Sequence, residues 1–198
     1  MALLRKPATM RSRQEASMSS SRIKAPFAFR LVGGPALGLA LVCGLMPASA
    51  ADQPSSPEDR RRFVSIARNL EQAPLDPGLK GDRAWAFAWL TEAPDVTVSI
   101  CADALGGLAK GEYPYTGELV LQNSFGMAVF AIEHPEEAND PDALQLAGIE
   151  GTLNAYRSIV GDKPEARSSD LDGLLKAQSR GGLPAFVHKA WIRCSANK

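Results

Sequence analysis

The sequence contains few of the residues on which most catalytic and metal sites depend. Its 198 residues include only two histidines and three cysteines. A tetrahedral zinc site needs four suitably spaced cysteine or histidine ligands, which this set does not supply. No serine falls in a Gly-x-Ser-x-Gly or Ser-x-x-Lys pattern, and the Gly106–Gly107 pair lacks the Gly-Lys-Ser/Thr of a phosphate loop. We therefore expect no metal ion, no cofactor and no catalytic residue that a motif would reveal.

The chain also lacks an apolar run long enough for a comfortable membrane span. Its longest run, Leu31–Met46, is interrupted by glycine and proline, and a bilayer needs about 20 apolar residues. A basic, serine-rich segment precedes the run, and the small residues Ala48-Ser49-Ala50 follow it as a cleavage signal. The pattern predicts a signal peptide over residues 1–50. An uncleaved N-terminal anchor is the alternative.

The whole chain has no net charge, but its N-terminal segment is basic and the remainder is acidic. Residues 1–50 carry seven basic residues and one acidic residue, which leaves 15 Lys and Arg against 21 Asp and Glu in residues 51–198. An acidic domain is repelled by nucleic acids and anionic membranes, so we expect neither as a partner. The export signal predicts a periplasmic or secreted protein, or a membrane-anchored one if the signal is retained.

Removal of the signal peptide would leave two cysteines, Cys101 and Cys194. In an exported domain two cysteines are most simply paired, so we predict a disulfide between them. The mature chain has the length of one domain with a substantial core. We expect it to be arranged as a mobile lead-in at 51–56, a helical domain at 57–194 and a tail at 195–198.

The clearest helix signals lie between Asp140 and Gly161. Asp140 is a good N-cap, Pro141 suits the first helical position, and Gly161 is expected to end the helix in a left-handed conformation. Large apolar residues recur on one face at three- and four-residue steps: Leu146, Ile149, Leu153, Tyr156 and Val160. A second ridge is made of small residues: Ala147, Gly151 and Ala155. The two faces predict a central helix that touches two neighbours.

Four further helices are expected from caps and periodicity. Ser56 and Pro57 open the first, whose core face is Phe63, Ile66, Ala67 and Leu70. The second, within Asp82–Ala93, is apolar almost all round, so we expect it to be buried with Trp85 and Trp89 packed in the core. The last two are Asp170–Ser179, ended by Gly181, and Ala185–Cys194.

Two stretches fit a helix and a strand alike. In Val96–Leu105, Val96, Val98 and Ile100 alternate as in a strand, whereas Val96, Ile100, Ala104 and Leu105 fit the spacing of a helix. In Thr116–His134 a hairpin would lack the favoured Asn-Gly or Asp-Gly turn, so a helix is preferred. The sequence therefore predicts an all-α single domain, a bundle of six or seven short helices. The alternative is an α+β fold with a small sheet of three strands: Val96–Ile100, Glu118–Gln122 and Met127–Ile132.

Candidate binding residues lie on two of the expected helices. Glu150, Asn154 and Arg157 share one edge of the Asp140–Gly161 helix and would line a cleft there, although residues beside a core stripe also pair with each other. Arg61 and Arg62 belong to an arginine-rich helix face that would dock a partner or simply be solvated. Both histidines have structural explanations: His134 follows a helix end, and His188 flanks an apolar face.

The scarcity of catalytic groups favours a binding function. We expect an exported, non-catalytic helical module that binds a protein partner or a component of the cell envelope. One alternative is an exported hydrolase that uses His188 or His134, because a Ser-His-Asp site is spatial and leaves no fixed sequence signature. Another is a small periplasmic chaperone or inhibitor.

Overall fold

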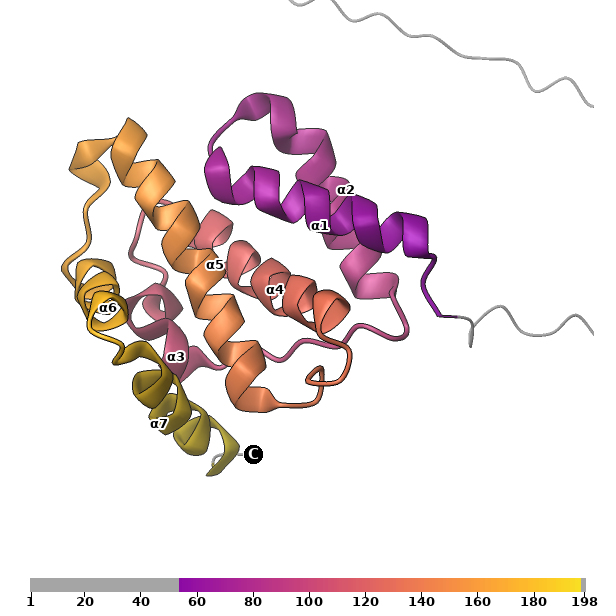
Figure 1. Ribbon diagram of the computed structural model, residues 1–198. Helices are drawn as coiled ribbons and strands as arrows, with labels where there is room; N and C mark the ends of the chain where they lie inside the picture. The colour runs from indigo at the N-terminus through magenta and orange to yellow at the C-terminus, as the bar shows by residue number, and fades with distance from the viewer. Residues whose placement is uncertain (1–53, 197–198) are drawn as a thin grey trace, which may run out of the picture. The chain divides into compact units, whose positions relative to one another are not determined.

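The computed structural model describes residues 54–196, so the signal-peptide prediction for residues 1–50 lies outside the described residues. Figure 1 shows the helices, and the loops between them, of this region. Seven α-helices and three 3-10 turns follow one another: α1 (Pro57–Gln72), η2 (Pro77–Leu79), α2 (Lys80–Glu92), α3 (Ala102–Leu105), η3 (Gly106–Lys110), α4 (Thr116–Glu133), α5 (Pro141–Asp162), η4 (Pro164–Ala166), α6 (Ser169–Ser179) and α7 (Leu183–Ala196). The all-α prediction is confirmed, because no strand occurs within 54–196.

Two apolar cores lie on either side of the α4–α5 pair. The N-terminal core packs α1 and α2 against α4, and its buried residues are Phe63, Ile66, Ala67, Leu70, Ala86, Val96, Phe125, Ala128 and Val129. The C-terminal core packs α5 against α3, η3, α6 and α7, and its largest buried residues are Leu119, Ile149, Leu153, Tyr156, Ile159, Leu171, Leu183 and Val187. The predicted core face of the first helix is thereby confirmed.

Helix α5 occupies the central position that its two faces predict. Its large residues belong to the C-terminal core together with Ala155, while Ala147 and Gly151 of the small ridge lie against α4. The Asp140 carboxylate accepts hydrogen bonds from the backbone N–H groups of Asp142 and Ala143, as expected for an N-cap. The predicted left-handed stop at Gly161 is wrong. The helix continues to Asp162, and Pro164 prevents a further turn because it has no N–H to donate.

The closest approach of two helices is between α4 and α5. A Cβ atom on Gly126 would lie 2.7 Å from the backbone oxygen of Ala147, and one on Gly148 would lie 2.9 Å from the backbone oxygen of Asn123. Only glycine fits at these two positions without displacing backbone. The ridge of small residues therefore predicts correctly that another helix packs closely on α5. Gly148, which lies outside the predicted ridge, is also part of this contact.

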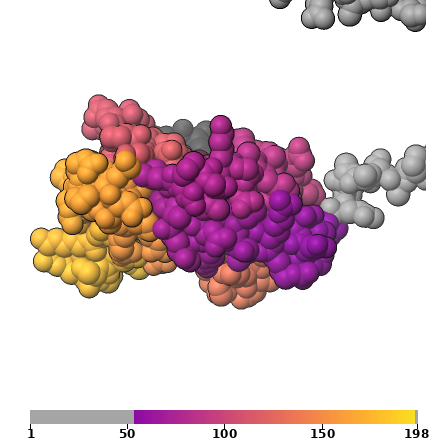
Figure 2. Space-filling view, turned by 90° about the horizontal axis from the view of Figure 1, so that it is seen from above, coloured from indigo at the N-terminus to yellow at the C-terminus, as the bar shows by residue number. Residues whose placement is uncertain are grey.

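Helix α2 departs from its prediction. Only Ala86 of this helix is buried, both tryptophans are partly exposed, and Phe87 has 55% of its surface exposed. Its main packing partner is α1, so one face is covered and the rest meets solvent. Figure 2 shows α1 and α2 at the surface together, in indigo to magenta. A helix that is apolar on every side is fully buried only if other helices pack around it, and α2 has too few such neighbours.

The segment between α2 and α3 contains neither a helix nor a strand from Val96 to Ile100. It runs past α4 and α5 to α3 (Figure 1), and the backbone of Cys101 at its end is extended. Cys101 is bonded to Cys194 of α7, which confirms the predicted disulfide. Helix α7 extends to Ala196, so the expected tail begins later than residue 195. Every helix within 54–196 is too short or too polar to cross a bilayer.

Candidate functional site

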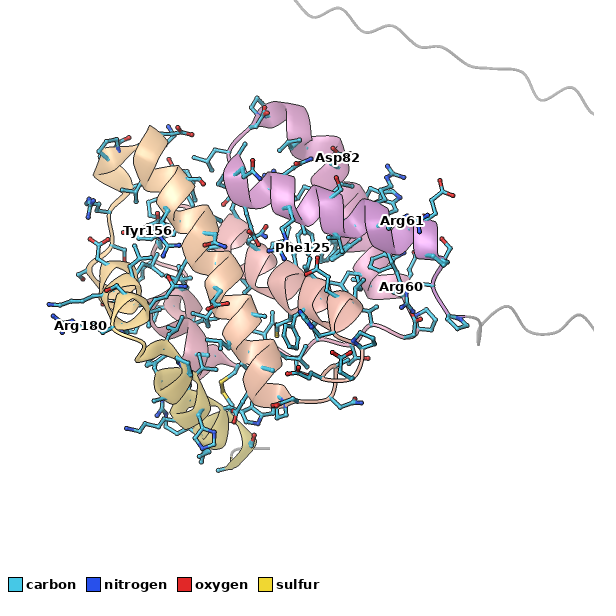
Figure 3. The ribbon with its side chains drawn as sticks, viewed as in Figure 1. Arg60, Arg61, Asp82, Phe125, Tyr156 and Arg180 are labelled. Carbon is cyan, nitrogen blue, oxygen red and sulfur yellow. A yellow bond between two sulfur atoms is a disulfide. The ribbon has the colours of Figure 1, made fainter. Side chains whose placement is uncertain are left out.

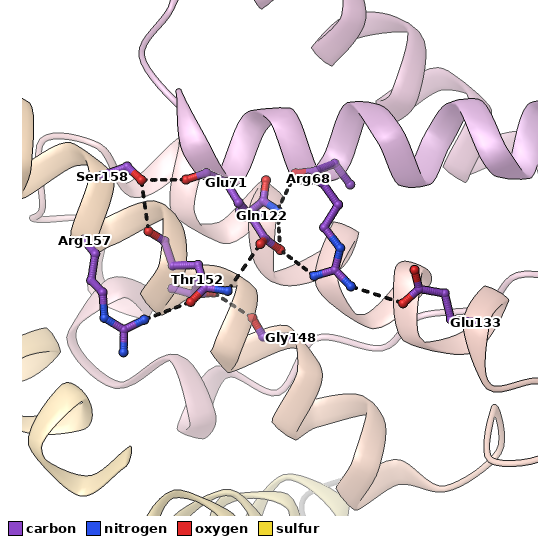
Figure 4. Close-up of polar contacts among 10 residues, drawn as sticks. Arg68, Glu71, Gln122, Glu133, Gly148, Thr152, Arg157 and Ser158 are labelled. Carbon is purple, nitrogen blue, oxygen red and sulfur yellow. Dashed lines mark hydrogen bonds and ion pairs between the residues drawn. The ribbon is translucent and has the colours of Figure 1, made fainter. Parts of the chain in front are cut away.

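A network of polar side chains joins α1, α4 and α5 where these three helices meet (Figure 4). Its hub is Glu71, a carboxylate with 8% of its surface exposed. Its side-chain oxygens accept hydrogen bonds from Asn154 Nδ2 at 3.2 Å and Gln122 Nε2 at 3.4 Å. Arg68 Nη1 lies 3.6 Å from the same carboxylate. A buried charge is tolerated only when it is paired in this way.

The network also fixes how α1 lies on the α4–α5 pair. Gln122 Nε2 donates to the Ala67 carbonyl at 3.1 Å, and Ser158 Oγ donates to the Glu71 carbonyl at 2.8 Å. The polar side chains therefore satisfy carbonyl groups of α1 as well as one another. Gln122 is buried because α1 covers this part of α4.

Beside the network is a small hollow of about 150 Å³ between α1, α4 and α5. Gly126 and Gly151 line it, and both lie where α4 and α5 pack closely together. The hollow is lined by charged and polar groups, namely Arg68, Glu71, Glu133, His134, Glu150 and Asn154. We call it the polar pocket. Two predicted site residues, Glu150 and Asn154, line this pocket as the cleft hypothesis required.

The third predicted residue of that edge, Arg157, lies outside the pocket. Its guanidinium donates to Asn154 Oδ1 at 2.8 Å and to the side-chain oxygen of Gln178 on α6. Arg157 therefore pairs with its neighbours, which is the alternative considered for residues beside a core stripe. Its contribution to the pocket is to orient the Asn154 amide toward Glu71.

A second hollow lies farther along α1, toward its N-terminus. It has a volume of about 370 Å³ and is lined by Pro57, Arg60, Arg61, Val64, Ile132 and Glu133. Apolar side chains form its floor, and two arginines stand at its rim. Glu133 lines both this apolar hollow and the polar pocket. We call the two hollows together the α1 groove.

The arginines of α1 differ in what they contact. Arg60 forms an ion pair with Asp95, and Arg68 donates to Glu133 at 3.1 Å. The guanidinium of Arg62 lies 3.9 Å from the ring centre of Trp85, a cation–π contact that covers this tryptophan. Arg61 is exposed, and its side chain makes no hydrogen bond or ion pair within residues 54–196. Of the two predicted docking arginines, only Arg61 lies at the groove.

The two histidines lie in separate places. His188 Nδ1 is 2.7 Å from Asp142 Oδ2, between α7 and the start of α5. Within the described residues no serine, threonine or cysteine forms a hydrogen bond with this imidazole. His134 lies with Glu136 and Glu137 in the exposed loop after α4, and their ligating atoms fall within 4.8 Å of one another.

Two tyrosines between η3, α5 and α6 have altered acidity. Burial raises the pKa of Tyr113 to about 12, and the nearby Tyr156 adds to this shift. Burial also raises the pKa of Tyr156, whose hydroxyl donates to Asp172 at 2.9 Å and accepts from the Ser168 N–H. Both phenols therefore stay protonated at neutral pH. Tyr156 joins α5 to the start of α6 through these bonds, the ring of Tyr113 packs beside it, and both lie apart from the α1 groove.

The sequence alone does not indicate the hub of the network. Glu71 and Asn154 are 83 residues apart, and Glu71 has the ordinary appearance of a polar residue near a helix end. Glu133 and Arg68 are equally ordinary in the sequence. Comparison of the chain with protein-family models, curated proteins and solved structures finds no match.

Proposed function

We propose that the described domain is the binding module of an exported protein and that it docks a segment of a protein partner in the α1 groove. The observation that carries the proposal is the unpaired Arg61 at the rim of an apolar hollow. Apolar surface beside an uncompensated charge is typical of a contact that is completed by another molecule. Arg61 projects away from the bundle in Figure 3.

The charges of the groove define the segment that would fit. Arg61 marks one end, Val64 and Ile132 the middle, and the exposed Glu150 the other end. A complementary segment carries a carboxylate, then an apolar side chain, then a lysine or arginine. This order distinguishes a specific partner from any acidic protein, because a reversed segment would place like charges together.

The groove has the surroundings expected of a rigid docking site. The Glu71 network holds α1 against α4 and α5, and the Arg68–Glu133 ion pair joins α1 to α4 where the two hollows meet. Side chains that are already held lose less conformational entropy when a partner binds. The polar pocket is also smaller than most sites for small molecules, so its size favours the insertion of a single side chain.

The test is to place a photo-crosslinking amino acid at Val64 and to identify the peptide that it captures in the producing cell. A synthetic peptide of the captured segment is then titrated against the wild type, Arg61→Glu and Glu150→Lys. We expect both variants to weaken binding, and we expect exchange of the matching charge on the peptide to restore it. Arg180→Glu is the matched control, since Arg180 is exposed at the opposite side of Figure 3.

Three results would overturn the proposal. Captured segments without the predicted order of charges would show that the groove is not a specific site. Equal binding by the wild type and Arg61→Glu would remove the observation on which the proposal rests. Cross-links spread over many unrelated proteins would favour a chaperone. The hydrolase alternative would be supported only if His188→Ala or His134→Ala abolished a measurable hydrolysis.

A further inference from the structure

The segment Val96–Ile100 has the sequence of a strand but no strand beside it. Val96 and Val98 are turned inward while Thr97 and Ser99 are exposed, as in an extended chain on a protein surface, and the exposed Ile100 ends this alternation. The segment follows a turn at Pro94–Asp95, and the backbone of Cys101 directly after it is extended. Valine, threonine and isoleucine are also the residues enriched in strands.

The backbone of this segment is almost entirely unpaired. Within residues 54–196 the Ser99 carbonyl is paired with the amide of Gln145, the Val96 N–H follows the turn at Pro94–Asp95, and no N–H from Thr97 to Ile100 has a partner. In an extended chain the N–H and C=O of one residue point to the same side, and those of its neighbours point to the other. Since Ser99 faces α5, the opposite edge presents the backbone groups of Val98 and Ile100.

An apolar hollow borders the same segment. Its volume is about 380 Å³, and it is lined by Phe87, Leu90, Thr91, Ala93, Val96, Thr97, Val98, Leu121 and Ser124. Phe87 and Ile100 are two of the three large apolar side chains that are most exposed within 54–196, at 55% and 49%. An open backbone edge beside an apolar hollow is the arrangement that binds peptides by strand addition.

The charges around the segment indicate which peptide would fit. From Ala84 to Ala109 the chain has three acidic residues, Glu92, Asp95 and Asp103, and no lysine or arginine. Asp95 and Asp103 are paired with arginines from other helices, whereas Glu92 has no partner within the described residues. A peptide with a flanking lysine or arginine is therefore favoured. A second copy of the chain is disfavoured, because its own segment has no lysine or arginine to offer to Glu92.

We propose that Val96–Ile100 is a second binding edge, which takes an extended peptide with alternating apolar residues and a basic flank by main-chain pairing. This edge involves α2, α4 and the α2–α3 segment, and none of its residues belongs to the α1 groove. It is therefore independent of the function proposed above. The two sites would allow one domain to hold two segments at once.

The probe is a fluorescent peptide, acetyl-Lys-Val-Thr-Val-Thr-Val-Lys-amide, titrated against the full domain by fluorescence anisotropy. We expect saturable binding, and we expect the amides of Val98 and Ile100 to exchange hydrogen more slowly when the peptide is bound. The same peptide with alternate N-methylated amides keeps its side chains but cannot pair on one edge. It should bind at least about tenfold more weakly, since main-chain bonds are lost.

Matched protein variants separate the two edges of the segment. Ile100→Pro removes an outward N–H and should weaken binding about tenfold, whereas Thr97→Pro removes an N–H on the other edge and should bind normally. Arg61→Glu should also bind normally, which distinguishes this site from the α1 groove. Circular dichroism of each variant confirms that it is folded before binding is interpreted.

Several outcomes would overturn the proposal. Equal affinity for the N-methylated peptide would mean that the hollow binds side chains without strand pairing. The absence of saturable binding to the wild type would remove the site altogether. A stable dimer that Ile100→Pro dissociates would show that a second copy occupies the edge, and slower exchange at Thr97 in place of Val98 would place pairing on the wrong edge.

Discussion

The N-terminal and C-terminal cores differ in composition and in how they are closed. The N-terminal core is built around aromatic contacts: the ring of Phe63 lies 5.2 Å from that of Phe125 and 4.7 Å from that of Trp89. The C-terminal core is mostly aliphatic and is closed by the Cys101–Cys194 disulfide. One core therefore has a covalent closure, whereas the other depends on packing and on the Glu71 network.

This difference indicates which part of the domain is freer to open. Helices α1 and α2 are attached to the rest of the domain by the N-terminal core, the polar network and surface ion pairs. Helices α3 and α7 are joined covalently, and both pack on α5. Local unfolding costs less free energy in regions that have fewer buried contacts. Both proposed binding surfaces include α1 or α2, on the side without the covalent closure.

The largest expected effect on stability comes from removal of the disulfide, because the C-terminal core then has no covalent closure, like the N-terminal core. The bond joins residues 93 apart in the sequence, so its loss frees a long loop in the unfolded chain. In the chain-entropy model we expect Cys101→Ser/Cys194→Ser to lose about 4–5 kcal/mol of unfolding free energy. Chemical denaturation of the variant and of the oxidised wild type measures this difference.

The reduced wild type is the control for the disulfide, because it breaks the bond without changing a residue. It should lose a comparable amount of stability. Hydrogen exchange should then show that protection falls more in α3 and α7 than in α1 and α2. Uniform loss across all helices would contradict the idea that the bond serves chiefly the C-terminal core.

The next prediction concerns the α4–α5 contact, which separates the two cores. In Gly148→Ala the new methyl group would lie 2.9 Å from the backbone oxygen of Asn123 and 2.8 Å from its Nδ2, so α4 and α5 must move apart. We expect a loss of about 1–3 kcal/mol, as is usual for overpacked cores. Thermal and chemical unfolding measure it.

Gly161→Ala is the matched control on the same helix. Nothing lies within 4 Å of the position that its Cβ would occupy, and its backbone is helical. Alanine should therefore stabilise the helix there by about 0.5–1 kcal/mol. If both variants lost stability to the same extent, the cost would reflect glycine replacement in general and the close contact would not be its cause.

The outcome at these glycines illustrates how far the sequence determines the fold. Caps, prolines and apolar periodicity are local, and they place α1, α4, α5, α6 and α7 within a few residues. The small ridge of α5 even predicts close packing. Burial of α2 was predicted wrongly because burial depends on how many neighbours the fold supplies, which no local pattern records.

The candidate site was less predictable than the fold for a similar reason. Glu150 and Asn154 share a helix edge, so their spacing alone places them together. Glu71, Arg68 and Glu133 come from two other helices, and only the packing of α1 on α4 brings them to the same pocket. The sequence left Val96–Ile100 open between helix and strand, and the segment is neither, because a partner strand is a property of the whole domain.

The Glu71 network gives a prediction of intermediate size for the N-terminal core. Glu71→Ala removes the acceptor of the Asn154 amide and one of the two acceptors of the buried Gln122 amide, whose bond to the Ala67 carbonyl remains. We expect a loss of about 1–3 kcal/mol, since an unsatisfied buried donor is costly. Chemical denaturation measures this loss.

Glu150→Ala is the control for the network, because it removes an exposed carboxylate from the same pocket. Its effect on stability should stay within about 0.5 kcal/mol. A double-mutant cycle of Glu71→Ala with Asn154→Ala should reveal coupling between the two residues. Additive losses would mean that Glu71 stabilises α1 by itself and that the network does not act as a unit.

The smallest expected effect is a pH dependence confined to the start of α1. Burial tends to raise the pKa of Asp95, but hydrogen bonds from Ser55 and the charge of Arg60 outweigh it and lower the pKa below its usual value of 3.8. A lowered pKa in the folded state stabilises the fold above the unfolded pKa. This contribution is lost as the pH falls through the folded pKa.

Asp95→Asn should therefore be less stable than the wild type near neutral pH, by up to about 1 kcal/mol for a surface ion pair. The difference should shrink in acid, because the wild-type carboxyl then becomes neutral as well. Thermal unfolding between about pH 2 and pH 7 measures the difference, with Glu165→Gln as a control for the change in net charge. A difference that stayed constant over this range would show that the charge of Asp95 does not hold the N-terminus of α1 in place.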